Sequence, residues 1–337
     1  MGIAYGSGAV PKKRLALLIC AAGVFLGAVL GGGEVVKTLG SKIIPQSIVG
    51  VDIALIILAS AALSLFIANL MGIPLSTSEV TVGAIVGVGV AFKIVYFGHL
   101  LIIVLWWLIV PIVALVLSYL ADKGLKMSEK RLQFLQRGKW PKILTALVIF
   151  TGFAEAFSAG MNNVANSVGP LVAAGMLSIN NGILIGGLFV AFGAMLLGGK
   201  VLETNGKKIT DLSLLQGITV SGLGAGLVIT ASLFGIPVPQ TQITTCSILG
   251  VGMSRKGREI WKKEVIERLL KVWVVSPFFS LIISYNLVKM FLEFDFYSVL
   301  ISFCMFVATI GFVSLLRHTK REKQAFYKES INKSGGR

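Results

Sequence analysis

The sequence GIPLSTSEVTVGAIVGVG at residues 72–89 returns as GIPVPQTQITTCSILGVG at residues 235–252. When residue 72 is aligned with residue 235, eight of the 18 positions are identical. A second alignment, which pairs residues 27–43 with residues 193–209, gives ten identities among 17 positions. The two halves of the chain therefore share one plan. Secondary transporters are commonly built from two such repeats, with the substrate near the membrane midplane where broken helices meet.

The repeated segments at residues 73–90 and 236–253 do not have the pattern of simple spans. Each begins close to a proline, passes through a polar cluster and ends in a glycine-spaced apolar run. Irregular backbone at membrane depth is tolerated only where it lines a cavity or is buried in protein. We therefore expect each segment to form a re-entrant hairpin.

The composition of the whole chain indicates a membrane protein. Apolar residues make up 55% of its 337 positions and charged residues only 14%, whereas soluble proteins have about 45–50% and 25%. This excess excludes an ordinary soluble enzyme, a disordered chain and a disulfide scaffold. A span needs about 20 mostly apolar residues. The sequence predicts an all-α polytopic membrane protein with two structural repeats, expected to be inverted, and with broken helices and re-entrant hairpins. The predicted spans are residues 15–33, 47–71, 97–120, 143–161, 182–199, 214–234, 270–292 and 296–316.

The basic residues predict which ends of the spans face the cytoplasm. Residues 121–142, 255–271 and 317–337 each hold seven Lys and Arg residues, and short basic loops stay on the cytoplasmic side. The net charge of +16 therefore reports orientation, and no nucleic acid is expected as a partner. The predicted domains are a first transmembrane repeat at residues 1–120, a basic cytoplasmic loop at residues 121–142, a second transmembrane repeat at residues 143–316 and a basic cytoplasmic tail at residues 317–337.

The start of the chain matches the middle of the second half. Residues 155–175 read EAFSAGMNNVANSVGPLVAAG, and Gly169 aligns with Gly2. The counterparts of residues 143–167 would then precede Met1. We expect that the first repeat lacks one helix and one polar motif, through truncation or a late start codon. An asymmetric protein that never had this segment is the alternative.

These motifs resemble those of the inorganic phosphate transporter (PiT) family. The family carries a Gly-Ala-Asn-Asp-x-Ala-Asn motif and a Pro-x-Ser-Thr-Thr-His hairpin in each half, and the corresponding residues here are 160–166 and 74–79. Within the family, the chain is similar to the bacterial sulfate permease branch. The resemblance covers nearly the whole chain and implies transport of an inorganic anion.

The chain departs from the phosphate pattern at positions that matter for coupling. The family's aspartate, implied to help hold a sodium ion, is Asn163 here. The hairpin histidine is Glu79 in the first half and Gln242 in the second, and the first-half Asn-Asp motif is absent from the chain. Sodium coupling therefore does not simply carry over. Proton coupling through an intramembrane carboxylate becomes a competing alternative.

The candidate site residues are polar side chains in apolar surroundings. We expect Gly160 and Gly169-Pro170 to break the helix around the asparagines, because a half-helix N-terminus with amide donors binds an oxyanion without a cation. Hydroxyls and amides of the two hairpins would complete a neutral pocket of donors, which suits a fully ionised dianion such as sulfate. Helix–helix hydrogen bonds and turn capping are the structural alternatives. The expected anion- or ion-binding residues are Asn162, Asn163, Asn166, Ser76, Thr77, Ser78, Thr81, Gln240, Thr241, Gln242 and Thr244.

Two carboxylates are expected at membrane depth, where charged groups are costly and usually functional. Glu155 lies within a predicted span, and Glu79 lies in a hairpin beside the hydroxyls. Either is a candidate for carrying a coupling proton. A structural contact with a hairpin amide or hydroxyl is the alternative for Glu155.

Together these features predict a secondary transporter, or permease, for an inorganic oxyanion in the cell membrane. Sulfate is slightly favoured over phosphate, and the coupling ion is H⁺ or Na⁺. A coupled phosphate transporter is the main alternative; a passive anion channel and a membrane enzyme acting on lipid phosphate are less favoured. The sequence has no His/Cys/carboxylate cluster and no P-loop, so no catalytic residue, metal or cofactor is expected. The expected partners are the anion and membrane lipid, and a homodimer stays open.

Overall fold

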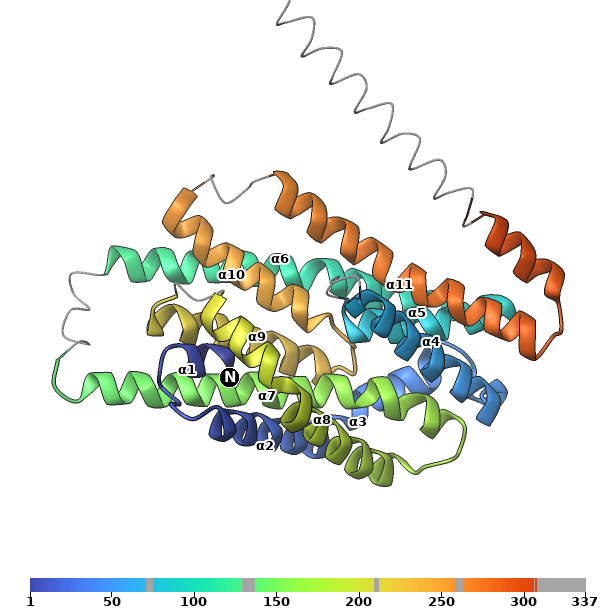
Figure 1. Cartoon of the computed structure of the whole chain (residues 1–337), viewed down its shortest axis with the longest axis horizontal. Helices are drawn as coiled ribbons and strands as arrows, with labels where there is room; N and C mark the ends of the chain where they lie inside the picture. The colour runs from blue at the N-terminus through green and yellow to red at the C-terminus, as the bar shows by residue number, and fades with distance from the viewer. Residues whose placement is uncertain (71–74, 129–136, 209–211, 258–262, 306, 308–337) are drawn as a thin grey trace, which may run out of the picture. The chain divides into compact units, whose positions relative to one another are not determined.

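The computed structural model describes residues 1–70, 75–128, 137–208, 212–257, 263–305 and 307, which are almost entirely helical (Figure 1). The long helices are α2 (Lys13–Gly31), α4 (Val51–Leu70), α5 (Thr77–Ala91), α6 (Phe97–Met127), α7 (Trp140–Ala173), α8 (Ile179–Lys208), α9 (Leu214–Leu233), α10 (Gln240–Lys256) and α11 (Lys263–Phe291). The short elements are α1 (Gly2–Gly6), α3 (Gly33–Lys37), the π-helical turn η1 (Thr38–Lys42) and the 3₁₀ turn η2 (Gln46–Ile48). The chain divides into two compact units, Met1–Tyr285 and Asn286–Arg337.

Six of the described helices are long and apolar enough to cross a membrane, namely α2, α4, α6, α7, α8 and α9. Each of them overlaps a predicted span. Helices α5 and α10 have only 15 and 17 residues. At 1.5 Å per residue they reach about 22–26 Å, which is less than the ~30 Å of a hydrocarbon core. These two segments therefore do not have the length of full spans. Each is one continuous helix from residue 77 or 240 onward, so the described residues show no hairpin turn within either helix, and the re-entrant hairpins stay a prediction.

The helix bounds recur along the chain with the spacing of the sequence matches. Helices α4 and α9 begin at residues 51 and 214, and α5 and α10 begin at residues 77 and 240. Each of these pairs keeps the spacing that relates residue 72 to residue 235. These matched bounds support the predicted repeat, which stays a prediction.

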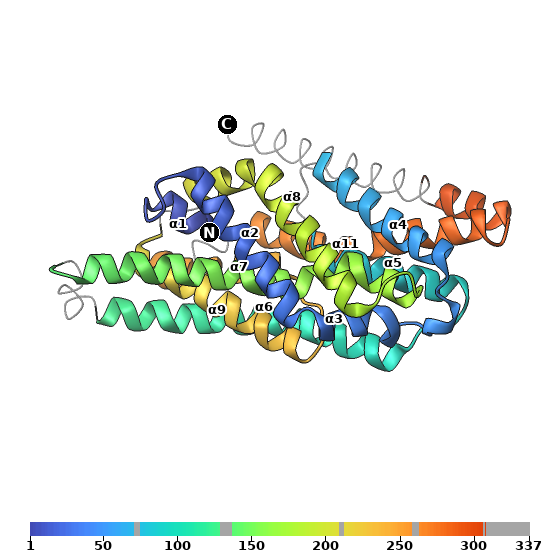
Figure 2. The same ribbon diagram turned by 90° about the horizontal axis from the view of Figure 1, so that it is seen from below.

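Helix α7 runs through the middle of the first unit, with α2, α8 and α9 beside it (Figures 1 and 2). Glycines allow α2 and α7 to approach closely. A Cβ atom at Gly27 would lie 1.8 Å from the carbonyl oxygen of Phe157, and one at Gly160 would lie 1.9 Å from that of Val24. Close backbone approach through small residues is a common way to pack membrane helices. The glycines of this crossing therefore serve packing.

The break that the sequence predicts around Gly160 and Pro170 is wrong, because α7 is one continuous helix through both residues. Gly160 is the contact point with α2. Pro170 falls in the last turn of α7, where its missing N–H and its ring disturb little of the remaining helix. The chain breaks instead in the first half, where Gly32 separates α2 from α3 and the π-helical turn η1 follows.

Similar glycine contacts hold both short helices. A Cβ atom at Gly87 of α5 would lie 2.3 Å from the carbonyl oxygen of Leu281 on α11, and one at Gly250 of α10 would lie 2.3 Å from that of Leu115 on α6. Gly250 is the counterpart of Gly87 in the predicted repeat, and Leu281 is the counterpart of Leu115. Each short helix is thus packed against a long one in the same way.

A buried acidic residue joins α6, α9 and α10. Asp122 is fully buried and its carboxylate accepts hydrogen bonds from Nε of Arg255 at 2.9 Å and from Nε2 of Gln216 at 2.9 Å. Gln216 also forms a capping box with Ser213 at the start of α9. Asp122 belongs to the segment 121–142 that the sequence assigns to a loop, but α6 continues to Met127.

In the second unit, a tight turn follows the end of α11 and leads to an apolar helix at Phe296–Met305. Phe294 adopts a positive φ of 52° in this turn. The carboxylate of Asp295 accepts a hydrogen bond from the backbone N–H of Ser298 at 3.1 Å, which is the contact that caps a helix N-terminus.

Candidate functional site

One face of α7 carries the polar residues that the sequence singles out. Glu155, Asn162 and Asn166 are spaced by seven and four residues, so they lie on one side of the helix. Asn162 is fully buried and Asn166 is only 9% exposed, whereas Glu155 is partly buried. The continuity of α7 therefore aligns two amides and one carboxylate toward the same neighbours.

Asn162 bridges the beginnings of the two short helices. Its Nδ2 donates to Oγ of Ser78 on α5 at 3.0 Å and to the carbonyl oxygen of Val238, just before α10, at 2.8 Å. Its Oδ1 accepts from the backbone N–H of Val238 at 3.1 Å. One side chain thus bonds to backbone groups just before α10 and to a hydroxyl of α5.

Asn163 and Asn166 meet Thr77, the first residue of α5. Thr77 Oγ1 donates to Oδ1 of Asn163 at 3.0 Å, and Nδ2 of Asn166 donates to Thr77 Oγ1 at 3.2 Å and to Asn163 Oδ1 at 3.3 Å. Oδ1 of Asn166 is buried and has no hydrogen-bond partner among the described residues. Thr77 is solvent-exposed. We call these five residues the asparagine cluster: Asn162, Asn163, Asn166, Thr77 and Ser78.

The N-termini of α5 and α10 both lie at this cluster. Neither N-cap residue, Ser76 or Pro239, makes a side-chain capping hydrogen bond. The first N–H groups of a helix have no partner within the helix, and they carry its positive partial charge. Such a terminus is well suited to an anion. The asparagine cluster therefore lies where two helices offer backbone donors.

A second contact connects the two short helices directly. Nε2 of Gln242 on α10 donates to Oε1 of Glu79 on α5, and both side chains are buried. These are the two positions where the family resemblance has histidines. Here a carboxylate and an amide form the pair, and the pair links the first turns of α5 and α10.

Glu155 has partners on two other helices. Oγ of Ser221 on α9 donates to its Oε2 at 2.9 Å, and Oγ1 of Thr244 on α10 donates to its Oε1 at 3.3 Å. Nε2 of Gln240 donates to the backbone carbonyl of Glu155 at 3.2 Å. Glu155 is thus bonded to hydroxyls, and the residues of α10 that contact it are distinct from those near Asn162.

The structure brings some of the predicted site residues together and leaves others apart. The side chains of Gln240, Gln242 and Thr244 bond to the two glutamates rather than to the asparagine cluster. Ser76 and Thr81 are buried in and beside α5, and Thr241 is exposed. No hydrogen bond of these last three side chains to the cluster occurs in the described part of the chain.

Two contributors to the site have no signal in the sequence. Ser221 is an ordinary serine in an apolar helix, and Val238 takes part through its backbone. The backbone just before Val238 is also held by Trp107 of α6, whose Nε1 donates to the carbonyl oxygen of Pro237 at 2.7 Å. Behind it lies an apolar cluster of α6, α9 and α10 that contains Val110, Ala114, Val228, Ala231, Ile236, Val238, Ile243 and Cys246.

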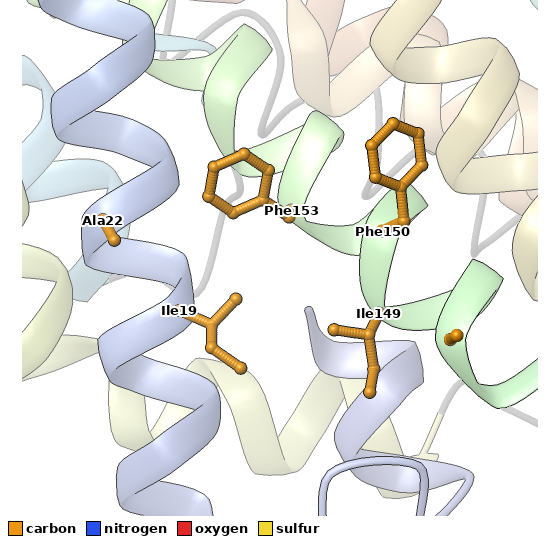
Figure 3. Close-up of a pocket in the computed structure, with 6 residues that line it drawn as sticks. Ile19, Ala22, Ile149, Phe150 and Phe153 are labelled. Carbon is orange, nitrogen blue, oxygen red and sulfur yellow. The ribbon is translucent and has the colours of Figure 1, made fainter.

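A separate groove between α2 and α7 has a different chemistry (Figure 3). It is lined by Ile19, Ala22, Ala146, Ile149, Phe150 and Phe153. Figure 3 shows the phenyl rings of Phe150 and Phe153 above Ile19 and Ile149. An all-apolar lining offers no donor to an anion and suits hydrocarbon. The asparagine cluster is therefore the better candidate for binding a polar solute.

Comparisons with known proteins agree with these features. A family model described as the phosphate transporter family matches residues 1–284. The sulfate permease CysP of Bacillus subtilis is 54% identical over 336 residues, which cover 100% of this chain and 93% of that protein. A solved structure described as "The sodium-dependent phosphate transporter" matches with a TM-score of 0.74 at 24% identity, over 87% of this chain and 94% of that one. This last likeness shows a common fold.

Proposed function

The chain belongs to the phosphate transporter family, and from that premise we propose that it is a multi-pass membrane permease for a tetrahedral inorganic oxyanion. Sulfate is favoured over phosphate. The relative that is 54% identical over nearly its full length is a sulfate permease, and this supports sulfate as the substrate. A permease moves its solute unchanged, so the residues of the site have binding and coupling roles and no catalytic role.

The observation that carries the proposal is the bridge made by Asn162. It connects two helix N-termini without side-chain caps, and the groups around it are amides, hydroxyls and backbone N–H groups. Sulfate only accepts hydrogen bonds, so a set of neutral donors satisfies it. Monohydrogen phosphate also donates one, and it would need an acceptor such as Oδ1 of Asn163 or Asn166.

The two glutamates near the site support coupling to a cation. A dianion that approaches unprotonated Glu79 and Glu155 is repelled, because two unit charges 4 Å apart interact by about 4 kcal/mol even at an effective dielectric constant of 20. A proton or a sodium ion that travels with the anion removes this repulsion. We infer H⁺ or Na⁺ symport, with the basic segment 121–142 and the C-terminal tail on the cytoplasmic side.

The second candidate is a coupled phosphate transporter. The descriptions of the family model and of the solved structure both name phosphate as the transported anion. Oδ1 of Asn166, which is buried without a partner in the described residues, would be an acceptor for a phosphate proton. This observation keeps phosphate as the alternative substrate.

The test is uptake of radiolabelled sulfate and phosphate into liposomes that contain the purified protein. We expect saturable sulfate uptake that excess unlabelled phosphate inhibits weakly. Asn162→Ala removes four hydrogen bonds, each contributing about 1 kcal/mol, and should lower uptake by roughly 30-fold or more. Thr77→Val, which keeps the size of an exposed side chain, should lower it by roughly fivefold.

Asn180→Ala is the matched control, because Asn180 is an exposed amide at the start of α8. It should transport as the unmodified protein does. Folding of each variant is checked by thermal unfolding in detergent, so that a lost fold is not mistaken for a lost site. Uptake of phosphate alone would refute sulfate as the substrate, and normal uptake by both Asn162→Ala and Thr77→Val would refute this site.

A further inference from the structure

Glu155 stands apart from the asparagine cluster along α7. Seven residues separate it from Asn162, which is about 10 Å along a helix. Its two carboxylate oxygens are each bonded to a hydroxyl, from Ser221 on α9 and from Thr244 on α10. Within the described residues, neither hydroxyl forms a hydrogen bond with the amides of the asparagine cluster. A carboxylate site with its own partners therefore exists next to the anion site.

The hydroxyl partners allow Glu155 to exist in both protonation states. A hydroxyl is a donor and an acceptor, so Ser221 and Thr244 can donate to the carboxylate or accept from the carboxylic acid after rotating their O–H bonds. Glu155 is partly buried, so water can deliver a proton to it. Glu79 differs, because it is 2% exposed and its Oε1 faces the amide N–H of Gln242. Oε2 of Glu79 is buried and has no hydrogen-bond partner among the described residues, whereas both carboxylate oxygens of Glu155 are bonded to hydroxyls.

Helix α10 connects this carboxylate to the anion site. Gln240 and Thr244 of α10 bond to the backbone and the carboxylate of Glu155. Val238, two residues before the start of the same helix, bonds to Asn162 in both directions. A proton on Glu155 weakens its bond with Thr244, because hydrogen bonds to an ionised acceptor are about twice as strong as those to a neutral one. Protonation of Glu155 therefore loosens the attachment of α10, the helix that follows Val238, and Val238 is the residue that bonds to Asn162.

We propose that Glu155, positioned by Ser221 and Thr244, is a proton site separate from the anion site at Asn162, and that α10 couples the two. This inference rests on the proposed permease function. On the outer side the carboxylate takes up one proton from water to become the neutral acid, and on the inner side it returns that proton to water. The anion and the proton thus move together, and no group changes its oxidation state.

The other ionisable groups near Glu155 are few among the described residues. On α2, the thiol of Cys20 interacts electrostatically with Glu155. The α-amino group of Met1 packs against Gly152, three residues earlier on α7. The side chains that α9 and α10 direct to Glu155, those of Ser221, Thr244 and Gln240, do not titrate. A pH response assigned to Glu155 must therefore be distinguished from the titration of two other described groups, the thiol of Cys20 and the α-amino group of Met1.

The test separates accumulation from exchange in liposomes that contain the purified protein. Labelled sulfate is supplied either with an imposed pH gradient or with equal unlabelled sulfate inside and no gradient. Glu155→Gln should lose gradient-driven accumulation at least tenfold, because the amide carries no transferable proton. Its exchange, which needs no net proton movement, should fall less than threefold. Glu34→Gln, which alters an exposed carboxylate on α3 paired with Lys37, is the control and should keep both activities.

A second variant tests the positioning role of Ser221. Ser221→Ala removes one donor to the ionised carboxylate, so protonation becomes easier and the pH midpoint of uptake should rise by about one unit. A variant that only damaged the structure would lower uptake equally at every pH. An unchanged midpoint would overturn the role of Ser221.

Each other outcome also decides the matter. Loss of both accumulation and exchange in a folded Glu155→Gln protein would place Glu155 in the anion site and overturn the proposal. Unchanged accumulation would overturn it as well, and accumulation driven by a sodium gradient but not by a pH gradient would replace the proton by sodium. An unmodified protein that moves neither sulfate nor phosphate in either assay would refute the permease function itself, which is a distinct failure.

Discussion

Replacing Asn163 with aspartate is expected to make transport depend on sodium. Its Oδ1 accepts from Thr77 and Asn166, and an aspartate could accept the same bonds while adding a charge. Asn163→Asp should therefore lower sulfate uptake at least tenfold in sodium-free buffer, because a carboxylate beside a dianion costs several kcal/mol. Added sodium should restore part of it, since the new carboxylate and Oδ1 of Asn166 are oxygen ligands for a cation.

The measurement is uptake with sodium or with choline as the external cation. Asn163→Ser is the neutral control, and it should respond to neither cation. Equal uptake by Asn163→Asp and the unmodified protein in choline would show that the charge at this position does not matter.

For single residues, the sequence identifies the polar side chains of the site better than it identifies the groups to which they bond. Asn162, Asn163 and Glu155 stand out because they are polar within apolar runs, and the structure places all three at helix contacts. Ser221 and the backbone of Val238 could not be found in this way. A lone serine is common in membrane helices, and a backbone group leaves no trace in the residue type, so both depend on tertiary packing.

Among the helices, the crossing of α2 and α7 provides the sharpest test. Gly27→Ala would place a methyl group 1.8 Å from the carbonyl oxygen of Phe157, so the two backbones must separate. The expected loss of stability is roughly 1–3 kcal/mol, measured as a lower midpoint of thermal unfolding in detergent.

Gly193 is the matched control for Gly27, because it occupies the same position of the predicted repeat and a Cβ atom there meets nothing within 4 Å. Gly193→Ala should leave stability unchanged or raise it by about 0.5–1 kcal/mol, since alanine favours helix. Equal effects of the two substitutions would contradict this account of the crossing.

The helices themselves were largely predictable, but their exact extent and continuity were not. Apolar runs located the six spans because each must cover the hydrocarbon core. The same reasoning assigned residues 121–142 to a loop, whereas α6 continues to Met127 and includes Asp122. That carboxylate is buried because Gln216 and Arg255 pair with it, and both partners come from distant parts of the sequence. The predicted helix break at Gly160 is wrong because this glycine lies at the contact between α7 and α2.

For the whole molecule, the basic loop predicts the orientation in the membrane. The exposed Lys126 is expected on the cytoplasmic side. In a protein whose Cys20, Cys246 and Cys304 are replaced by alanine, a membrane-impermeant maleimide should therefore label Lys126→Cys in intact cells only after permeabilisation. The turn at residues 293–295 joins the predicted spans 270–292 and 296–316, and it is expected outside because the tail at residues 317–337 is expected in the cytoplasm. Phe294→Cys in this turn should therefore be labelled without permeabilisation. The opposite pattern would reverse the proposed topology.

The predicted repeat of two halves also belongs to this scale, and it stays a prediction. The spacing that relates residue 72 to residue 235 in the sequence recurs in the beginnings of α4 and α9 and of α5 and α10. Patterns survive in this way because both halves must bury similar faces. What the repeat could not predict is the asymmetry of contact: a Cβ atom at Gly27 would meet a backbone carbonyl, and one at Gly193 would meet nothing within 4 Å.

The hydrogen bond from Trp107 to Pro237 has a practical consequence for watching this molecule at work. The indole is 8% exposed and its partner is the residue just before Val238, which in turn holds Asn162. Indole emission depends on the polarity and bonding around the ring, so Trp107 is a native fluorescent probe whose bonded partner, Pro237, is one residue from Val238. Stopped-flow fluorescence, with the Trp107→Phe protein as background, can then time each half of the transport cycle without any attached dye.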